Sequence, residues 1–302
     1  MKAIIWGHPL HSHTHSYIHY GFVRAFRHLG FETHWFDSDS KVDGFDFADS
    51  IFLTEGQVDS KIPLRKDCFY VLHNCHGLQY DDLPKVLRLN TLFDKNKQGE
   101  ALNQYTYYKS NSKLGILAQP WATDLLPEEI DESTTMYDWT RENSIYYVGS
   151  YHGHDGTGTI PIIDAFKNRA KQYGLSLVPL GGYTAGSHMI DCQEAASLVK
   201  KSFMAPTLQC QWQVDSGYVP CRIFKNISYG HLGITHSSYV SSLFGDLVVY
   251  DRDLATLCDK SFEAINERKP IRESMSLVKR DHTYLNRIRT ILEVMGVPGE
   301  KK

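Results

Sequence analysis

Residues 3–36 read AIIWGHPLHSHTHSYIHYGFVRAFRHLGFETHWF and decide the fold class. The apolar run Ala3–Trp6 predicts a strand, and Glu32–Phe36 predicts a second one. Between them, Tyr17–Leu29 has apolar residues at helical spacing, and Gly30 is typical of the residue that ends a helix. A strand, a helix and a strand in this order are typical of a parallel sheet with a crossover helix.

The same alternation continues along the chain and restarts after Pro127–Arg141, an acidic and hydroxyl-rich segment that predicts a linker or a surface segment between domains. Strands are predicted at Ser50–Thr54, Cys68–Leu72, Leu114–Gln119, Ser144–Val148, Leu175–Leu180, Pro206–Cys210, Gly233–Thr235 and Leu247–Tyr250. Helices are predicted at Thr159–Tyr173, Cys192–Phe203, Pro220–Tyr229, Leu254–Asn266 and Ser274–Met295. We therefore expect an α/β protein with two Rossmann-like domains facing across a cleft. The expected domains are residues 1–135 and 136–275, followed by a C-terminal helix of about 276–302.

Composition excludes several classes of protein. The 302 residues carry a formal net charge of −3 and no run of Lys and Arg, which argues against nucleic-acid binding. No stretch approaches the roughly 18 apolar residues of a membrane span. The six cysteines form no CxxC pair, so we expect a reducing, cytoplasmic location.

Four histidines follow the first predicted strand: His8, His11, His13 and His15. Ligands of doubly wound sheets bind beyond the carboxyl ends of the strands, and imidazole is the usual general base near neutral pH. We expect His8, His11 and His13 to be catalytic and His15 to lie at the same site. Histidines that alternate along one loop do not by themselves supply a convergent ligand set, so no metal is predicted.

A second histidine pair, His73 and His76, follows the strand predicted at Cys68–Leu72. Because the ends of parallel strands meet at one edge of a sheet, these side chains are expected to face the same crevice.

Gly149 and Ser150 begin a glycine-rich loop between a predicted strand and a predicted helix. Glycines let a backbone approach a phosphate, and a helix N-terminus attracts anions. The spacing is not GxGxxG, so the prediction is anion binding without a dinucleotide fingerprint.

Arg222 and Lys225 lie three residues apart on one face of the helix predicted at Pro220–Tyr229. A guanidinium and an ammonium placed together can bind a diphosphate.

The segment Arg222–Gly230, RIFKNISYG, resembles the R-x-F-E-x-x-x-x-G segment of group-1 and CgeB-like glycosyltransferases of the GT-B fold. Shorter pieces at Pro120–Asp124, Tyr147–Ser150 and His282–Arg287 are similar to that family as well. The resemblance implies a nucleotide-sugar donor on the C-terminal domain, residues 136–275, and an acceptor on the N-terminal domain, residues 1–135, where His15, His73 and His76 would face it. It also implies that the last helix, about 276–302, packs back on the N-terminal domain.

Lys225 stands where those enzymes usually carry a glutamate that holds the nucleotide ribose. We therefore expect Lys225 to serve the diphosphate, with Asn226 or Ser228 near the ribose. The departure leaves both a retaining and an inverting outcome open.

The function expected is hexosyl or deoxyhexosyl transfer from a nucleoside-diphosphate sugar to a glycan or glycoconjugate hydroxyl, with no cofactor and no metal. Two D-x-D triplets, Asp37–Asp39 and Asp251–Asp253, match the metal motif of the other transferase fold but lie in turn-like contexts.

Three alternatives remain. A flavodoxin-like reductase would use Gly7–Pro9 near a flavin phosphate, but it needs only one sheet. A zinc-dependent hydrolase would use His11, His13 and His73. A nucleotide-binding module without catalysis would leave the histidine loops unexplained.

Overall fold

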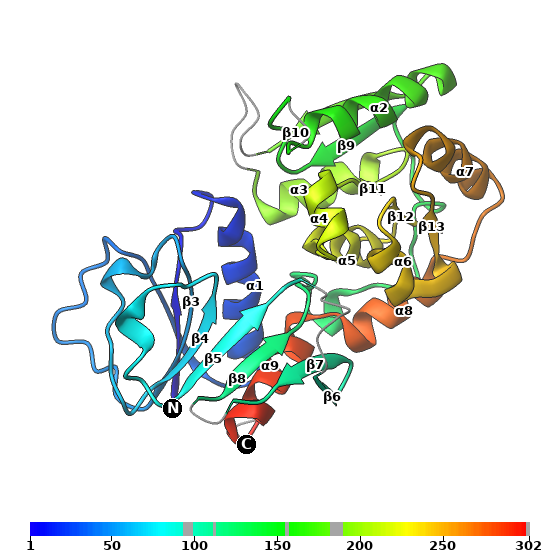
Figure 1. Cartoon of the computed structure of the whole chain (residues 1–302). Helices are drawn as coiled ribbons and strands as arrows, with labels where there is room; N and C mark the ends of the chain where they lie inside the picture. Colours follow the sequence, from blue (N-terminus) through cyan, green and yellow to red (C-terminus); the bar gives the residue numbers. More distant parts are fainter. Residues whose placement is uncertain (93–98, 111–112, 155–156, 182–189, 300–302) are drawn as a thin grey trace. The chain divides into compact units, whose positions relative to one another are not determined.

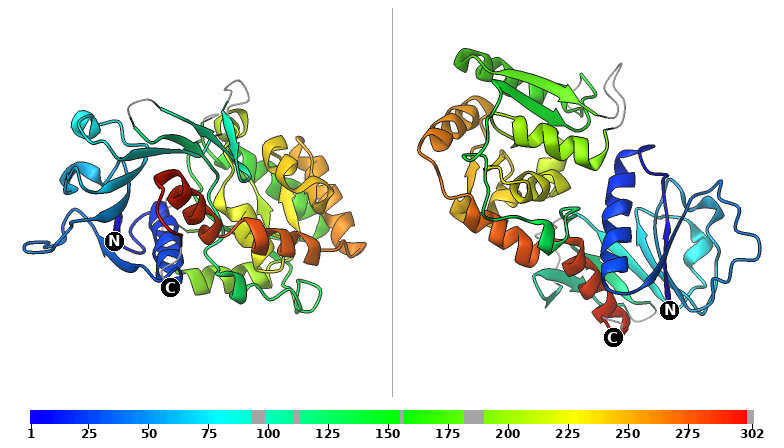
Figure 2. Two further views of the ribbon diagram at one scale, coloured as in Figure 1. Left: turned by 90° about the horizontal axis from the view of Figure 1, so that it is seen from below. Right: turned by 180° about the vertical axis from the view of Figure 1, so that it is seen from behind.

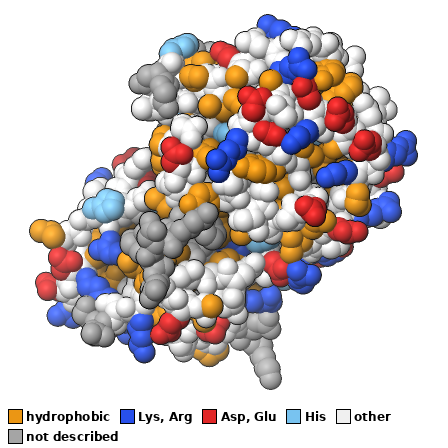
Figure 3. Space-filling model, turned by 45° about the vertical axis from the view of Figure 1, so that its right-hand side comes forward, with side chains coloured by type: hydrophobic (Ala, Val, Ile, Leu, Met, Phe, Trp, Pro, Cys, Tyr) orange, Lys and Arg blue, Asp and Glu red, His pale blue; other side chains and the backbone are white. Residues whose placement is uncertain are grey.

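A computed structural model describes residues 1–92, 99–110, 113–154, 157–181 and 190–299 of the chain (Figure 1). The chain divides into two compact units, unit 1 with Met1–Asp124 and Tyr284–Lys302, and unit 2 with Leu125–Thr283. Among the helices of the described residues, none is long and apolar enough to cross a membrane. On the face drawn in Figure 3, acidic and basic side chains are interspersed, and no patch of one sign dominates.

Unit 1 is built on an eight-stranded sheet with the order β2-β1-β3-β4-β5-β8-β7-β6. The six strands β2, β1, β3, β4, β5 and β8, in this order across the sheet, are parallel. The strand β7 is antiparallel to β8, and β6 is antiparallel to β7. The bounds are β1 Lys2–Trp6, β2 Glu32–Phe36, β3 Ser50–Glu55, β4 Phe69–His73, β5 Val86–Asn90, β6 Glu100–Leu102, β7 Tyr105–Tyr108 and β8 Gly115–Ala118. The sequence did not predict β5, β6 and β7, which carry polar residues among the apolar ones, and β6 and β7 are also short.

Alternating side chains give the sheet of unit 1 two different faces. On one face, Ile4, Trp6 and Tyr70 join an aromatic-rich cluster that the loop residues Phe47 and Tyr80 also enter. The helices α1 (Thr14–His28) and α9 (Tyr284–Met295) lie side by side and cover the sheet as well (Figures 1 and 2). Covering both faces explains why the central strands are continuously apolar.

Gly21, in the middle of α1, is explained by this helix pair. A Cβ at Gly21 would lie 2.4 Å from the ring of Tyr284, and that ring also packs on Phe22 with centroids 4.6 Å apart. A glycine inside a helix destabilises it by roughly 1 kcal/mol relative to alanine, which here is offset by close packing of the two helices.

The single helix predicted at Ser274–Met295 is wrong, because the chain forms α8 (Arg272–Asp281) and α9 with a break between them. His282 buries its ring in unit 2, with centroids 4.7 Å from Phe224 and 5.7 Å from Phe244. Two residues later, Tyr284 is buried against α1 of unit 1. Tertiary packing therefore ends one helix and starts the next where the local sequence would allow one helix.

Unit 2 has two groups of parallel strands and seven described helices. The strand β9 (Ser144–Val148) pairs with β10 (Ser176–Leu180), and β11, β12 and β13 form the second group. The remaining bounds are β11 Pro206–Thr207, β12 Gly233–Thr235, β13 Val248–Tyr250, α2 Ile160–Ala170, α3 Cys192–Lys201, α4 Gln211–Asp215, α5 Cys221–Ser228, α6 Ser238–Phe244 and α7 Leu254–Asn266. The sequence did not predict α4 and α6, which are short and rich in polar residues.

Two links join the strand groups of unit 2. The amide of Phe203 donates to the Ser144 carbonyl at 2.7 Å, and the Tyr147 hydroxyl donates to the Leu208 carbonyl at 2.9 Å. The carboxyl ends of β9 and β11 are therefore neighbours.

The segment predicted as a linker, Pro127–Arg141, packs into unit 2. Ile130 and Met136 are fully buried, and the Met136 amide donates to the Gly230 carbonyl at 2.9 Å. Lys279 of α8 pairs with Glu132 at 2.7 Å. Two buried apolar side chains, a backbone hydrogen bond and an ion pair therefore fix this segment to unit 2.

Arg287 of α9 is a fully buried cation, and we expect its loss to destabilise unit 1. Its Nε donates to the Pro120 carbonyl and its Nη2 to the Trp121 carbonyl, both at 2.8 Å, and its Nη1 bonds the Tyr105 hydroxyl. Arg287→Met leaves these acceptors buried without a donor, which should lower the free energy of unfolding by about 2–5 kcal/mol in urea titrations. The exposed Arg289→Met is the matched control, and an equal effect of the two variants would contradict this assignment.

Candidate functional site

The loop between β1 and α1, together with the first turn of α1, gathers three of the predicted histidines. The rings of His8 and His13 stack with centroids 4.1 Å apart, and those of His13 and His15 lie 5.2 Å apart. His13 is also the N-cap of α1, because its Nδ1 accepts from the His15 amide at 3.2 Å. A Cβ at Gly7 would lie 2.2 Å from Nδ1 of the buried His19, so glycine is required where the loop crosses this ring.

Glu55, which the sequence reasoning missed, lies beneath this loop at the end of β3. Its side chain is only 3% exposed, with Oε1 2.6 Å from His8 Nε2 and Oε2 3.8 Å from His15 Nδ1. Burial raises the pKa of Glu55 and lowers the pKa of His8. Both shifts favour the uncharged forms of the two groups, so burial acts against a separated charge on either one. The available signal was a carboxylate directly after an apolar strand.

His73 and Trp121 form the other wall of the cluster. The His73 ring, at the end of β4, lies 4.7 Å from the Trp121 ring and 5.6 Å from the His15 ring. Burial lowers the pKa of His73 to about 4. It also lowers the pKa of His15 to about 3, to which the nearby His73, His13 and His8 rings add. These imidazoles are therefore neutral at physiological pH.

Several polar atoms of this cluster are buried and have no hydrogen-bond partner among the described residues: Nδ1 of His15, His19 and His73, and Nε1 of Trp121. Buried polar atoms are nearly always paired in proteins, so an unpaired group of them indicates a place where water or a ligand binds.

The other two predicted histidines are placed differently. His11 is exposed with a φ of 67°, and its Nδ1 lies 3.3 Å from the Tyr17 hydroxyl. His76 is exposed on the loop after β4. The structure thus brings together His8, His13, His15 and His73, and it leaves His11 and His76 at the surface.

In unit 2, Arg222 is fixed at the carboxyl end of β9. Its Nε donates to the Val148 carbonyl at 3.0 Å, and its Nη1 donates to the Tyr147 hydroxyl at 2.7 Å and to the Leu208 carbonyl at 3.1 Å. The guanidinium also lies over the Tyr147 ring, 4.3 Å from its centroid. These contacts hold the cation rigidly at the edge where doubly wound sheets bind ligands.

Gly149 is required for this position of Arg222. A Cβ there would lie 1.8 Å from Arg222 Nη2, so only glycine lets the guanidinium lie against the strand end. No described residue accepts a hydrogen bond from Nη2, which leaves that edge of the fork for an anion.

The loop after Gly149 closes on the start of α2. The Ser150 carbonyl accepts from Thr159 Oγ1 at 2.8 Å, and the His152 carbonyl accepts the amides of Thr159 and Ile160. Because these first amides are engaged and Pro161 has none, the guanidinium is the stronger anion-binding group at this edge.

A second group of unpaired polar atoms lies at the ends of β11 and β12, and it too escaped the sequence reasoning. The atoms are Oγ1 of Thr207, Oε1 of Gln209, both ring nitrogens of His236 and Oγ of Ser237, all buried and without a partner among the described residues. Burial lowers the pKa of His236 to about 4, although the backbone of Gln209 and Thr207 opposes this. Leu208, whose carbonyl binds Arg222, lies between Thr207 and Gln209, so the guanidinium and this group share one edge. The signal was the run His236–Ser238 directly after a predicted strand.

The other predicted donor residues lie along α5. Lys225 is half-buried one turn after Arg222. Asn226 donates to the Ala205 carbonyl at 2.8 Å, just before β11 begins. Ser228 bonds the Lys225 carbonyl and lines a small hollow of about 120 Å³ with Trp139. The structure therefore does not bring Asn226 and Ser228 to the strand edge that holds Arg222.

Both D-x-D triplets have structural roles. Asp37 Oδ1 accepts from the Asp39 amide and Asp251 Oδ1 from the Asp253 amide, each at 2.9 Å. Asp253 also caps α7, and Lys260 pairs with Asp251 at 2.7 Å.

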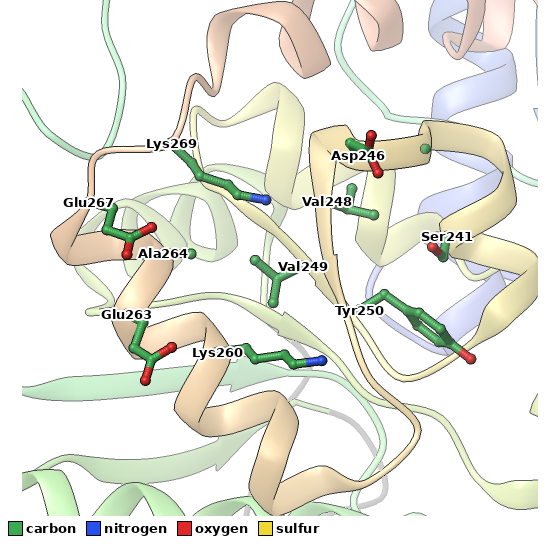
Figure 4. Close-up of a pocket in the computed structure, with 11 residues that line it drawn as sticks. Ser241, Asp246, Val248, Val249, Tyr250, Lys260, Glu263, Ala264, Glu267 and Lys269 are labelled. Carbon is green, nitrogen blue, oxygen red and sulfur yellow. The ribbon is translucent and has the colours of Figure 1, made fainter.

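A hollow of about 370 Å³ lies beside β13 and α7, away from the predicted residues (Figure 4). Its lining mixes Lys260 and Lys269 with Asp246, Glu263 and Glu267. It shares no residue with the donor edge around Arg222.

Comparison with solved structures identifies the fold. A variant of T4 phage β-glucosyltransferase in complex with UDP-glucose matches 98% of this chain and 98% of its own, with a TM-score of 0.54 and 10% identity. An α,α-trehalose-phosphate synthase (UDP-forming) from Burkholderia vietnamiensis matches 93% of this chain and 79% of its own, with a TM-score of 0.52 and 9% identity. An α-glucosyltransferase solved with UDP and a 13-mer DNA containing an HMU base matches 93% and 95%, with a TM-score of 0.50 and 9% identity.

The chain has the GT-B fold. The predicted α/β class is confirmed, and the resemblance seen around Arg222–Gly230 agrees with it at the level of the fold. No family model matches the sequence, and no curated protein matches it either.

Proposed function

We propose that this GT-B protein transfers a hexosyl or deoxyhexosyl group from a nucleoside-diphosphate sugar to a hydroxyl of a glycan or glycoconjugate, as a member of the group-1 or CgeB-like enzymes. The observation that carries the proposal is the Arg222 guanidinium, held by Val148, Tyr147 and Leu208 at the carboxyl edge of unit 2. The T4 phage enzyme and the DNA-bound enzyme were solved with UDP-glucose and UDP, which supports a nucleotide sugar as the donor.

Departure of a nucleoside diphosphate leaves negative charge on the β-phosphate, which a rigid cation stabilises without reorganisation. Arg222 would hold that phosphate through Nη2, with Lys225 as a second cation and with Gly149 and Ser150 lining the approach. This arrangement places the charge stabilisation on side chains, so we propose that transfer requires no metal. The unpaired groups of Thr207, Gln209, His236 and Ser237 would bind hydroxyls of the donor. Asn226 and Ser228 remain the proposed ribose contacts, and in this structure they lie away from the strand edge that holds Arg222.

The histidine cluster of unit 1 would bind and deprotonate the acceptor. His8 is the proposed base. Glu55 Oε1 lies 2.6 Å from His8 Nε2 and can accept a hydrogen bond from the Nε2–H group, which leaves Nδ1 to take the proton from the hydroxyl of the acceptor sugar. Such a base serves an inverting transfer. His13 and His15 would orient the hydroxyl, His73 would form the wall, and His11 and His76 would contact outer parts of the acceptor.

A glycan acceptor fits the surface better than DNA does. The net charge is −3, and the face in Figure 3 carries no basic patch. The six free cysteines fit a reducing, cytoplasmic compartment.

A thermal-shift panel tests the donor. We expect nucleoside diphosphates and their sugars to raise the melting temperature, since a ligand at 100 times its Kd adds about 2.7 kcal/mol to stability. Nucleoside monophosphates and free sugars, which lack the diphosphate, should shift it much less. A melting temperature that no nucleoside diphosphate or nucleoside-diphosphate sugar changes would argue against a nucleotide-sugar enzyme.

A further inference from the structure

The loop before α1 and the first turn of that helix place three imidazoles within reach of a single ion. One ring nitrogen each from His8, His13 and His15 lies within 4.8 Å of the other two. In a tetrahedral zinc site with Zn–N bonds of about 2.0–2.1 Å, ligand nitrogens lie about 3.4 Å apart. Ring rotations and a small movement of the loop would close this difference, because His8 and His13 precede the helix.

The chemistry of the surrounding atoms suits a transition metal. His15 Nδ1 is buried and has no hydrogen-bond partner among the described residues. Glu55 Oε1 lies 2.6 Å from His8 Nε2, which is the carboxylate contact that orients metal-binding histidines and leaves Nδ1 as the ligand. Its Oε2, 3.8 Å from His15 Nδ1, is placed to become a fourth ligand. Imidazole and carboxylate together favour Zn²⁺, Co²⁺ or Ni²⁺ over Mg²⁺.

Binding would also involve the start of α1. His13 Nδ1 accepts the His15 amide at 3.2 Å, so a neutral His13 that binds metal through Nε2 must place its proton on Nδ1 and release this cap. The loop therefore has two arrangements: in the free protein His13 caps α1, and in the metal complex His13 binds the ion instead.

We infer that His8, His13, His15 and Glu55 form a binding site for one divalent transition metal ion, and that this ion inhibits sugar transfer. The inhibition rests on the proposed function, in which His8 must be free to accept the acceptor proton. A metal on Nδ1 occupies the lone pair that would take this proton.

Titration of tag-free protein, stripped with EDTA and freed of the chelator, tests the site. Zn²⁺ calorimetry should give one ion per chain, and Co²⁺ should produce the visible absorption of a four-coordinate site. His13→Asn and His15→Asn should each weaken Zn²⁺ binding at least about tenfold, as expected for metal-site residues. His34→Asn is the matched control, because His34 also bonds a carboxylate, Glu32 at 2.8 Å, on β2. Absence of one-to-one binding, or equal weakening by the control, would overturn the site.

An activity assay tests the inhibition separately. Transfer should persist in EDTA and fall as Zn²⁺ fills the site. Half of the activity should be lost at the free Zn²⁺ concentration that half-saturates the site in calorimetry. Transfer that requires Zn²⁺, or that ignores a filled site, would overturn the inhibitory role. One-to-one binding in a protein that transfers no sugar with or without EDTA supports the site and refutes the proposed function.

Discussion

Replacing Arg222 by lysine is expected to weaken the binding of the nucleoside diphosphate by about ten- to a hundredfold. A charge-assisted hydrogen bond contributes about 1.5–3 kcal/mol, and lysine keeps the charge but not the fork that is anchored on Val148 and Leu208. Calorimetry with the best nucleotide of the thermal-shift panel measures this, and Arg222→Ala should lose more. The exposed Arg252→Gln, on the β13 side of unit 2, should bind as the wild type does. Unchanged affinity in Arg222→Lys and Arg222→Ala would refute the donor assignment.

A substitution that leaves the guanidinium in the chain separates position from charge. Gly149→Ala introduces a Cβ 1.8 Å from Arg222 Nη2, so the side chain must move away from the strand end. Donor affinity should fall although the charge is retained. A melting temperature close to that of the wild type in the same variant would show that the loss comes from the site and not from unfolding.

The sequence predicted the parallel strands best, because a strand buried on both faces is a continuous apolar run bounded by turn residues. Ser144–Val148 and Gly233–Thr235 were predicted at their observed bounds. The break between α8 and α9 was not predictable, since it depends on His282 meeting Phe224 and Phe244, residues distant in the chain.

Site residues were predicted only where a reactive or charged side chain stands directly beside the end of a predicted strand or the start of a predicted helix. The histidines and Arg222 follow predicted strands or begin a predicted helix, and they were found. Glu55 was missed because it reads as the polar end of a strand, and a buried carboxylate becomes reasonable only once His8, 47 residues away in the sequence, is seen beside it. His236 and Ser237 were missed because the short helix after them was not predicted.

The largest effect on turnover is expected from His8. If His8 is the base, His8→Ala removes general base catalysis, and kcat should fall about 10²- to 10⁴-fold. Glu55→Gln keeps an oxygen near Nε2 but cannot stabilise the imidazolium, so a smaller fall of about ten- to a hundredfold follows from the loss of one charge-assisted bond. Neither residue belongs to the donor edge of unit 2, so the nucleotide Kd should stay unchanged and the effect should lie in kcat.

A matched pair elsewhere in unit 1 provides the control for His8. His34 Nε2 lies 2.8 Å from Glu32 Oε1, but this pair is more exposed, with side chains 31% and 61% accessible against 14% and 3% for His8 and Glu55. His34→Ala removes the same type of contact, a hydrogen bond between an imidazole and a carboxylate. If the His8 pair is catalytic because it is buried at the end of a strand, His34→Ala must leave kcat unchanged. Initial rates at saturating donor and acceptor decide the question. A kcat for His8→Ala equal to that of His34→Ala would remove His8 as the base and pass the role to His13, whose ring stacks on His8 at 4.1 Å.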